Sequence, residues 1–269
     1  MTIDTIRPLL REHLESFGIC HFEGEEYWSW GGEALGMRVG MQLNRLREPL
    51  VDGAATPKQY RRFYDFIAEP RIAAVVHSMK ADAILQSGSY IESQLMVDEA
   101  VLDVGCSIGY LTLFYALRSE ARSVVGWDWS RRSIEIAREQ ARKRGVGNVT
   151  FEQHDIAVAK ADRTFDVVCS TQTLGTPEVG PQALARAAAS LRSGGRLICV
   201  EPLADVEQAT TFLQSAASVN LALQQHEFVY FSDLGERGAY PAFVFQKGGE
   251  AVPIDLAASY RRVLDVLAG

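Results

Sequence analysis

Five short apolar segments, separated by stretches with helical periodicity, constrain the fold of this chain more than any other feature of its sequence. The five segments are residues 100–104, 123–127, 149–152, 165–170 and 196–200. Apolar strands that alternate with helices indicate a mostly parallel sheet with helices on both faces. Between and after the five segments, helical spacing predicts a helix that begins at the cap residue Ser130, a helix over 181–191 that ends at Gly194 and Gly195, and a helix over 206–224. Two further strand-like runs flank a segment rich in Gly and Pro, 233–241, which can join antiparallel strands at a sheet edge. We therefore predict a doubly wound α/β fold with a mostly parallel, seven-stranded sheet.

The first 95 residues differ in pattern, because most of them have helical rather than strand-like periodicity. Apolar residues recur at helical spacing over residues 6–17, and Thr56 followed by Pro57 is a helix-start signal. We expect residues 1–95 to form a helical cap that contributes to a substrate pocket. Residues 96–269 would form a Rossmann-like core, and the cap would lie over the ends of its strands.

One segment of this N-terminal region, residues 21–32, is aromatic, acidic and bounded by glycines, which predicts a loop. Tyr27, Trp28 and Trp30 are its most unusual residues. They would form either the wall of a substrate pocket or an anchor that holds the N-terminal segment on the core. The sequence leaves both interpretations open.

Composition narrows the class of protein. Apolar residues make up 47% of the chain and the net charge is −7, so we expect a soluble globular protein and disfavour a nucleic-acid partner. No apolar run is long enough to span a bilayer, and the N-terminus lacks a signal-peptide core, which predicts a cytoplasmic protein without a membrane partner. The four cysteines form no CxxC pair, and Cys169 and Cys199 lie in apolar runs typical of buried thiols. No His, Cys, Asp and Glu cluster has metal-ligand spacing, so we expect no metal.

The residues that directly follow the strands carry the chemical information, because ligands of open parallel sheets bind at the carboxyl ends of the strands. Gly105 and Gly109 allow a tight backbone turn beside a ligand, but the loop lacks the GxGxxG spacing of a pyrophosphate site. Asp103 would repel a phosphate and attract an ammonium group. Asp128 can accept hydrogen bonds from a ribose diol, and Asp155 from an adenine amino group. The pattern indicates an adenosine that carries an amino acid and no phosphate.

These residues resemble the class I S-adenosylmethionine-dependent methyltransferase family. The resemblance covers roughly residues 97–247 and is carried by five segments in matching order and spacing: VLDVGCSIGYLTL (101–113), VVGWDWS (124–130), FEQHDI (151–156), TFDVVCST (164–171) and LRSGGRLICVEP (191–202). It implies S-adenosylmethionine as cofactor and S-adenosylhomocysteine as product.

The resemblance also implies a role for each matching residue. The carboxylate of Asp103 and the loop formed by Gly105, Cys106, Ser107 and Gly109 would hold the methionine end. Asp128 would bind the ribose hydroxyls with Trp129 beside the adenine, and Asp155 and the Ile156 backbone would contact the adenine edge. Ser170 and Thr171 would border the sulfonium and the reacting methyl. Two features depart from the family pattern: Ser107 replaces the usual middle glycine, and STQTLG replaces the Asn/Asp-Pro-Pro-aromatic signature of many nucleic-acid methyltransferases.

We therefore expect an enzyme that transfers a methyl group from S-adenosylmethionine to an O, N, S or C atom of a small-molecule acceptor. The alternatives are a protein or peptide acceptor, other chemistry on the same cofactor, or binding without catalysis. An NAD-dependent oxidoreductase is disfavoured because GxGxxG is missing. No residue is identified as a general base, a homodimer is left open, and the sequence does not specify the acceptor.

Overall fold

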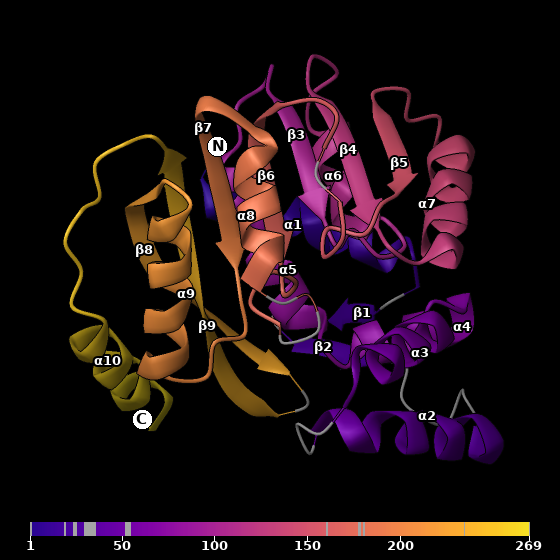
Figure 1. Ribbon diagram of the computed structural model, residues 1–269. Helices are drawn as coiled ribbons and strands as arrows, with labels where there is room; N and C mark the ends of the chain where they lie inside the picture. The colour runs from indigo at the N-terminus through magenta and orange to yellow at the C-terminus, as the bar shows by residue number, and fades with distance from the viewer. Residues whose placement is uncertain are drawn as a thin grey trace.

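The computed structural model of the protein describes residues 2–18, 20–23, 26–29, 36–51, 55–159, 161–176, 179, 181–233 and 235–268. A seven-stranded sheet lies between two layers of helices (Figure 1). Its strands follow the order β5 (Val149–Gln153), β4 (Ser123–Asp128), β3 (Ala100–Val104), β6 (Phe165–Thr171), β7 (Leu191–Val200), β9 (Glu236–Lys247) and β8 (Leu221–Asp233). The first five are mutually parallel, and β9 is antiparallel to both its neighbours. This sheet confirms the predicted fold class.

Alternate residues of the central strands face two separate hydrophobic cores. Val101 of β3 belongs to the core on one face and Leu102 to the core on the other, and both side chains are fully buried. The first core is completed by α1 (Ile3–Glu15), α5 (Ala81–Gln94), α6 (Tyr110–Leu117) and α7 (Arg131–Arg144). The second is completed by α8 (Pro181–Ala189), α9 (Val206–Ser218) and α10 (Leu256–Ala268). Burial on both faces explains why these strands are continuously apolar in sequence.

The carboxy-terminal part of the sheet differs from the sequence prediction in two places. The helix expected over 206–224 ends at Ser218, and the segment expected as a connection, 233–241, is mostly strand. β8 and β9 form one long hairpin whose register runs from Leu221 paired with Lys247 to Asp233 paired with Glu236. Pro241 sits inside β9 because Glu201 N donates to its carbonyl, a bond that needs no proline N–H.

The predicted helix over 181–191 also ends early, at Ala189, and β7 begins at Leu191 rather than at Arg196. Leu191 pairs with Phe165 across a register shift, and Gly194 has a φ of 72° within the irregular stretch. Glycine adopts this φ without strain, so the two glycines that predicted a helix end accommodate a bulged strand instead.

The N-terminal helices form as the capping signals predict. In α3 (Pro57–Ile67), Thr56 and Gln59 make a capping box, with Pro57 in the first turn. α4 (Pro70–Ser78) begins after the cap residue Glu69, and α2 (Gly36–Val51) packs against α3. These helices lie beyond the carboxyl ends of the parallel strands (Figure 1). Among the described residues, every helix is too short or too polar to cross a bilayer.

The segment predicted as an aromatic loop contains two short strands instead. β1 (Cys20–Glu23) and β2 (Glu26–Ser29) pair antiparallel, with Phe22 opposite Tyr27 and His21 opposite Trp28. Aromatic residues are favoured in strands, and this preference outweighs the loop signal of the flanking glycines. Trp30, and the side chains of Tyr27 and Trp28, lie outside the part of the chain that the structure describes.

A buried ion pair joins α5 to the segment before β4. The side chains of Glu92 and Arg122 are 3% and 2% exposed, and Arg122 Nη1 donates to Glu92 Oε2 at 2.8 Å. The guanidinium also donates to the carbonyls of Tyr115 and Met96. Burial raises the pKa of Glu92, and Arg122 acts against that rise. The ion pair therefore holds the end of α5 against the sheet, and this contact depends on both charged side chains.

Removing one partner of this pair is expected to cost more than removing both. Arg122→Met leaves the buried carboxylate of Glu92 with the guanidinium of Arg118, whose Nε lies 4.0 Å from Oε1, as a more distant cation, and should lower the free energy of unfolding by about 3–5 kcal/mol. Combining it with Glu92→Leu should recover part of that loss. Urea denaturation of both variants measures the difference, with Arg131→Ala, in an exposed pair with Glu135, as the near-neutral control. Equal losses in the single and double variants would contradict the argument.

Candidate functional site

The loop after β3 turns sharply across the carboxyl ends of the parallel strands. The N–H groups of Gly105 and Cys106 both donate to the Trp127 carbonyl on β4, at 2.8 and 3.0 Å. Three loop residues have left-handed backbone, with φ of 77° at Gly105, 50° at Ser107 and 90° at Gly109. The loop thus enters α6 in a compact turn at the strand ends.

Gly105 is required by packing as well as by its backbone angle. A Cβ atom there would lie 2.1 Å from Thr173 Oγ1, which belongs to the turn after β6. Ser107 occupies the position where the family usually has glycine, and its left-handed conformation costs a serine roughly 1 kcal/mol. Its N–H donates to Asp128 Oδ2 at 2.9 Å, which helps to hold the residue in this conformation.

Asp128 ties the two loops of the site together. Its Oδ2 accepts from Ser107 N, and its Oδ1 accepts from Ser130 N at 2.8 Å. Burial raises the pKa of the Asp128 carboxyl to about 6, while these two N–H groups act against the rise. The carboxylate lies at the end of β4, where the sequence predicted an acceptor for a diol.

Asp103 lies on the neighbouring strand and is 4% exposed. Thr112 Oγ1 donates to its Oδ2 at 2.5 Å, and Cys169 Sγ lies 3.8 Å from its Oδ1. Burial raises the pKa of the Asp103 carboxyl to about 6, and the nearby charge of Asp128 adds to the effect. Cys106, also predicted for this loop, is buried beside them. The structure therefore brings the predicted loop and both carboxyl groups to one place.

Asp155, predicted to bind adenine, has a partner that the sequence did not suggest. Its Oδ2 pairs with the guanidinium of Arg61 on α3, and its Oδ1 accepts from Ala157 N at 2.9 Å. The same guanidinium lies over the ring of Trp129, 5.4 Å from its centroid. Ile156 is buried, and its carbonyl accepts from Arg186 Nη1 at 3.2 Å. An element of the N-terminal region thus contacts the predicted adenine side directly.

Ser170 and Thr171 end β6, and Ser170 points into the protein. Its side chain is fully buried and its Oγ donates to Glu201 Oε1 at 2.5 Å. Glu201 also accepts from Leu174 N at 3.2 Å and Gly175 N at 3.0 Å, so it holds the turn that follows β6. Burial raises the pKa of Glu201 to about 7.

Glu201 was missed in the sequence, although the rule that found the other carboxylates also applies to it. It is the first polar residue after the apolar segment of β7. Arg61 had no comparable local signal. His154, next to Asp155, stacks on Trp127 at 3.8 Å between centroids, away from the ligand side. Within the described ranges, no group of three His, Cys, Asp or Glu side chains could hold a metal ion.

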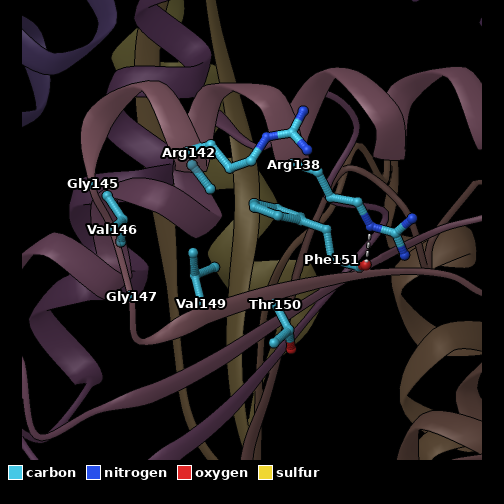
Figure 2. A pocket seen from close by; sticks show the side chains of 9 residues that line it. Arg138, Arg142, Gly145, Val146, Gly147, Val149, Thr150 and Phe151 are labelled. Carbon is cyan, nitrogen blue, oxygen red and sulfur yellow. Dashed lines mark hydrogen bonds between the residues drawn. The ribbon is translucent and has the colours of Figure 1, made fainter.

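A hollow lies on the other side of Phe151 from Gly109, between α7 and the edge strand β5. It has a volume of about 410 Å³, and Figure 2 shows its lining, which includes Arg138, Arg142, Val149 and Phe151. Arg138 Nε donates to the Phe151 carbonyl at 2.8 Å. Three more lining residues, Gly145, Val146 and Gly147, precede β5. This hollow lies toward the amino end of the strand, so we place the candidate site at the opposite, carboxyl edge.

Known proteins with a similar fold are numerous. The cyclase SpnF matches with a TM-score of 0.54 at 17% identity, over 74% of this chain and 98% of that one. A methyltransferase dependent on S-adenosylmethionine from Methanosarcina mazei matches with a TM-score of 0.48 at 16% identity, over 61% of this chain and 98% of that one. The likeness to SpnF supports the fold alone, and the names of these proteins differ in chemistry.

Sequence comparison gives more specific matches. A probable (S)-tetrahydroprotoberberine N-methyltransferase 2 from Papaver bracteatum is 31% identical over 74 residues, which are 28% of this chain and 21% of that protein. The chain thus matches only about a fifth of the length of that relative. The family described as a methyltransferase domain matches over residues 96–236. This match spans more than half of the sequence, and the chain therefore belongs to the methyltransferase domain family.

Proposed function

We propose that this protein binds S-adenosylmethionine at the carboxyl edge of β3, β4 and β5 and transfers its methyl group to a small-molecule acceptor. The observation that carries the proposal is the hydrogen bond between Ser107 N and Asp128. It joins a left-handed loop to a carboxylate that can accept hydrogen bonds from a diol, beside a second carboxyl group at Asp103. These carboxylate acceptors suit the ammonium and hydroxyl groups of an amino acid joined to a nucleoside.

Different residues of the chain would bind different parts of the cofactor. The loop 105–109 and the Asp103 carboxylate would hold the methionine end, Asp128 the ribose, and Trp129, Asp155 and the Ile156 backbone the adenine. Ser170 and Thr171 would shape the floor at the reacting end, where Glu201 fixes the turn. The bound cofactor supplies an electrophilic methyl group on its sulfonium. The protein then contributes alignment of the acceptor and exclusion of water, and we assign no general base.

Two features support a small acceptor. α2, α3 and α4 lie beyond the strand ends, where they would limit the size of a molecule that reaches the site. The curated relative carries the name of an alkaloid N-methyltransferase, and an alkaloid is a small molecule. Within the expected cap, residues 1–95, α1 and α5 pack in the main core, so we propose that α2, α3 and α4 act as the cap of this site and residues 96–269 as its cofactor-binding core. The buried free thiols of Cys106, Cys169 and Cys199 suit a reducing, cytoplasmic environment.

The experiment that tests this proposal measures the products of the reaction. Purified protein is incubated with S-adenosylmethionine carrying a labelled methyl group and with a panel of small nucleophiles, peptides and a no-acceptor control. Label in a small molecule together with S-adenosylhomocysteine supports the proposal. Label in peptides alone would replace the acceptor class, and turnover of an acceptor without S-adenosylhomocysteine would indicate other chemistry on the same fold.

Asp128→Ala is expected to weaken S-adenosylhomocysteine binding at least about a hundredfold. The variant removes the acceptor of two ribose hydroxyl groups, and hydrogen bonds to a charged group together contribute roughly 3 kcal/mol. Calorimetric titration measures the loss, and circular dichroism checks the fold. Asp98→Ala, which removes an exposed carboxylate outside the site, serves as the control for net charge. Unchanged affinity in Asp128→Ala would place the nucleoside elsewhere.

Cofactor affinity is expected to rise as pH increases through about 6. Burial raises the folded-state pKa of Asp103 and Asp128 to about 6, above the usual 3.8. The protonated carboxyl groups therefore contribute fully to the free energy of unfolding below about pH 3.8, and this contribution is lost as the pH rises through 6. The ammonium and hydroxyl groups of the ligand bind more favourably to the ionised carboxylates. The affinity for the ligand therefore increases over the same pH interval, and binding releases protons near pH 6. Titrations in two buffers with different ionisation enthalpies measure this release, and its absence would contradict the assignment.

A further inference from the structure

Helix α3 lies on the predicted adenine end of the site and contacts both loops that form it. Arg61 pairs with Asp155 after β5 and lies over Trp129 after β4. One helical turn further along, Asp65 Oδ1 accepts from Ser130 Oγ at 2.8 Å. These contacts come from one face of α3, because residues four apart on a helix are neighbours. An element outside the matched family region thus covers residues expected to hold the nucleoside.

The space that remains beneath α3 is small. A pocket of about 30 Å³ is lined by Tyr60, Arg61, Tyr64, Trp129 and Asp155, together with Ala157 and Val179. This volume holds a water molecule, whereas pockets for nucleoside-sized ligands are on the order of 300 Å³. A purine ring therefore fits between Trp129 and α3 only when the Arg61 side chain has moved.

Arg61 and adenine also present similar N–H donors to the same acceptor, the carboxylate of Asp155. The guanidinium N–H groups and the exocyclic amine of adenine are both planar donors, and each would bind a carboxylate oxygen of Asp155. The other oxygen, Oδ1, already accepts from Ala157 N. The Arg61 guanidinium already lies on Oδ2 and over the Trp129 ring, and the pocket beside it is only about 30 Å³. The two donors therefore compete for the same approach to the Asp155 carboxylate.

We propose that Arg61 is a further residue of the cofactor site, and that it sets cofactor affinity by competing with the adenine amine for Asp155. The inference rests on the proposed function, because it takes the ligand to be an adenosine derivative. α3 is then a movable wall of the nucleoside subsite, and Arg61 is the residue that must leave Asp155 before adenine binds.

The size of the effect follows from the exposure of the pair. The side chains of Arg61 and Asp155 are 49% and 21% exposed, and partly exposed ion pairs are weak and are screened by salt. Loss of the competitor should therefore tighten binding by roughly three- to fivefold at low ionic strength. The effect should shrink at high ionic strength, where the pair itself is weakened.

The test compares Arg61→Ala with wild type and with Arg62→Ala, which removes an exposed arginine from the same helix. Adenosine is the main probe because it is uncharged, so its own contacts respond little to salt. Calorimetry or ligand-observed NMR gives its affinity at low and high ionic strength, and S-adenosylhomocysteine is titrated alongside. Thermal melting checks that all variants are folded.

We expect Arg61→Ala to bind adenosine about three- to fivefold more tightly than wild type at low salt and nearly equally at high salt, with Arg62→Ala matching wild type. In an Asp155→Ala background, Arg61→Ala should bring no gain. Equal or weaker binding by Arg61→Ala at low salt overturns the competition, and weaker binding would mean that Arg61 stacks on the bound ring. Binding of S-adenosylhomocysteine by wild type in that case leaves the proposed function intact. If none of these proteins binds either probe, both proposals fail.

Discussion

The pairing of β3 with β4 on one side and β6 on the other is the constraint on which the candidate site depends. The chain leaves β3 toward β4 and β5, then crosses back to β6 and continues toward β7. Loops on the two sides of β3 therefore diverge, and this leaves room for a ligand at the carboxyl edge. The loop 105–109 fills part of that room and is anchored on the Trp127 carbonyl. The register between β3 and β4 thus sets the distance from this loop to Asp128.

The carboxyl groups of Asp103 and Glu201 are buried at this edge and that of Asp128 is half-buried, and the desolvation of all three is only partly offset. Asp103, Asp128 and Glu201 all have raised pKa values, with burial as the largest cause in each case. Their protein partners are backbone N–H and hydroxyl groups rather than cations. A ligand with a positive charge and hydroxyl donors would bind favourably at such a site, because its charge and hydrogen bonds would offset part of the desolvation cost of the carboxylates. The same arrangement is unfavourable for phosphates.

The N-terminal region contributes to the protein in two different ways. α1 and α5 belong to the main core and are held there by burial and by the pair of Glu92 with Arg122. α3 instead touches the site through polar contacts of half-exposed side chains, while its own apolar face packs on α2 and α4 in a separate small cluster. Polar, solvent-exposed contacts are weak, so α3 can shift relative to the sheet at low cost.

Much of the fold and of the site was determined by the sequence itself. Continuous apolar strands and the caps at Thr56 and Ser130 are local signals, and the structure confirms them. The polar residues after the strands are local signals too, and the structure brings Asp103 and Asp128 together at one edge of the sheet, while their roles stay predictions. The bounds of the β8–β9 hairpin and the strands β1 and β2 were wrongly predicted, because strand pairing and the strand preference of aromatic residues outweigh local Gly and Pro signals. Only the tertiary structure decided that Glu201 holds the turn after β6, that Arg61 reaches Asp155, and that Arg122 meets Glu92. Each of these contacts joins residues far apart in the chain, and their partners are chosen by the packing of whole elements, which no local pattern encodes.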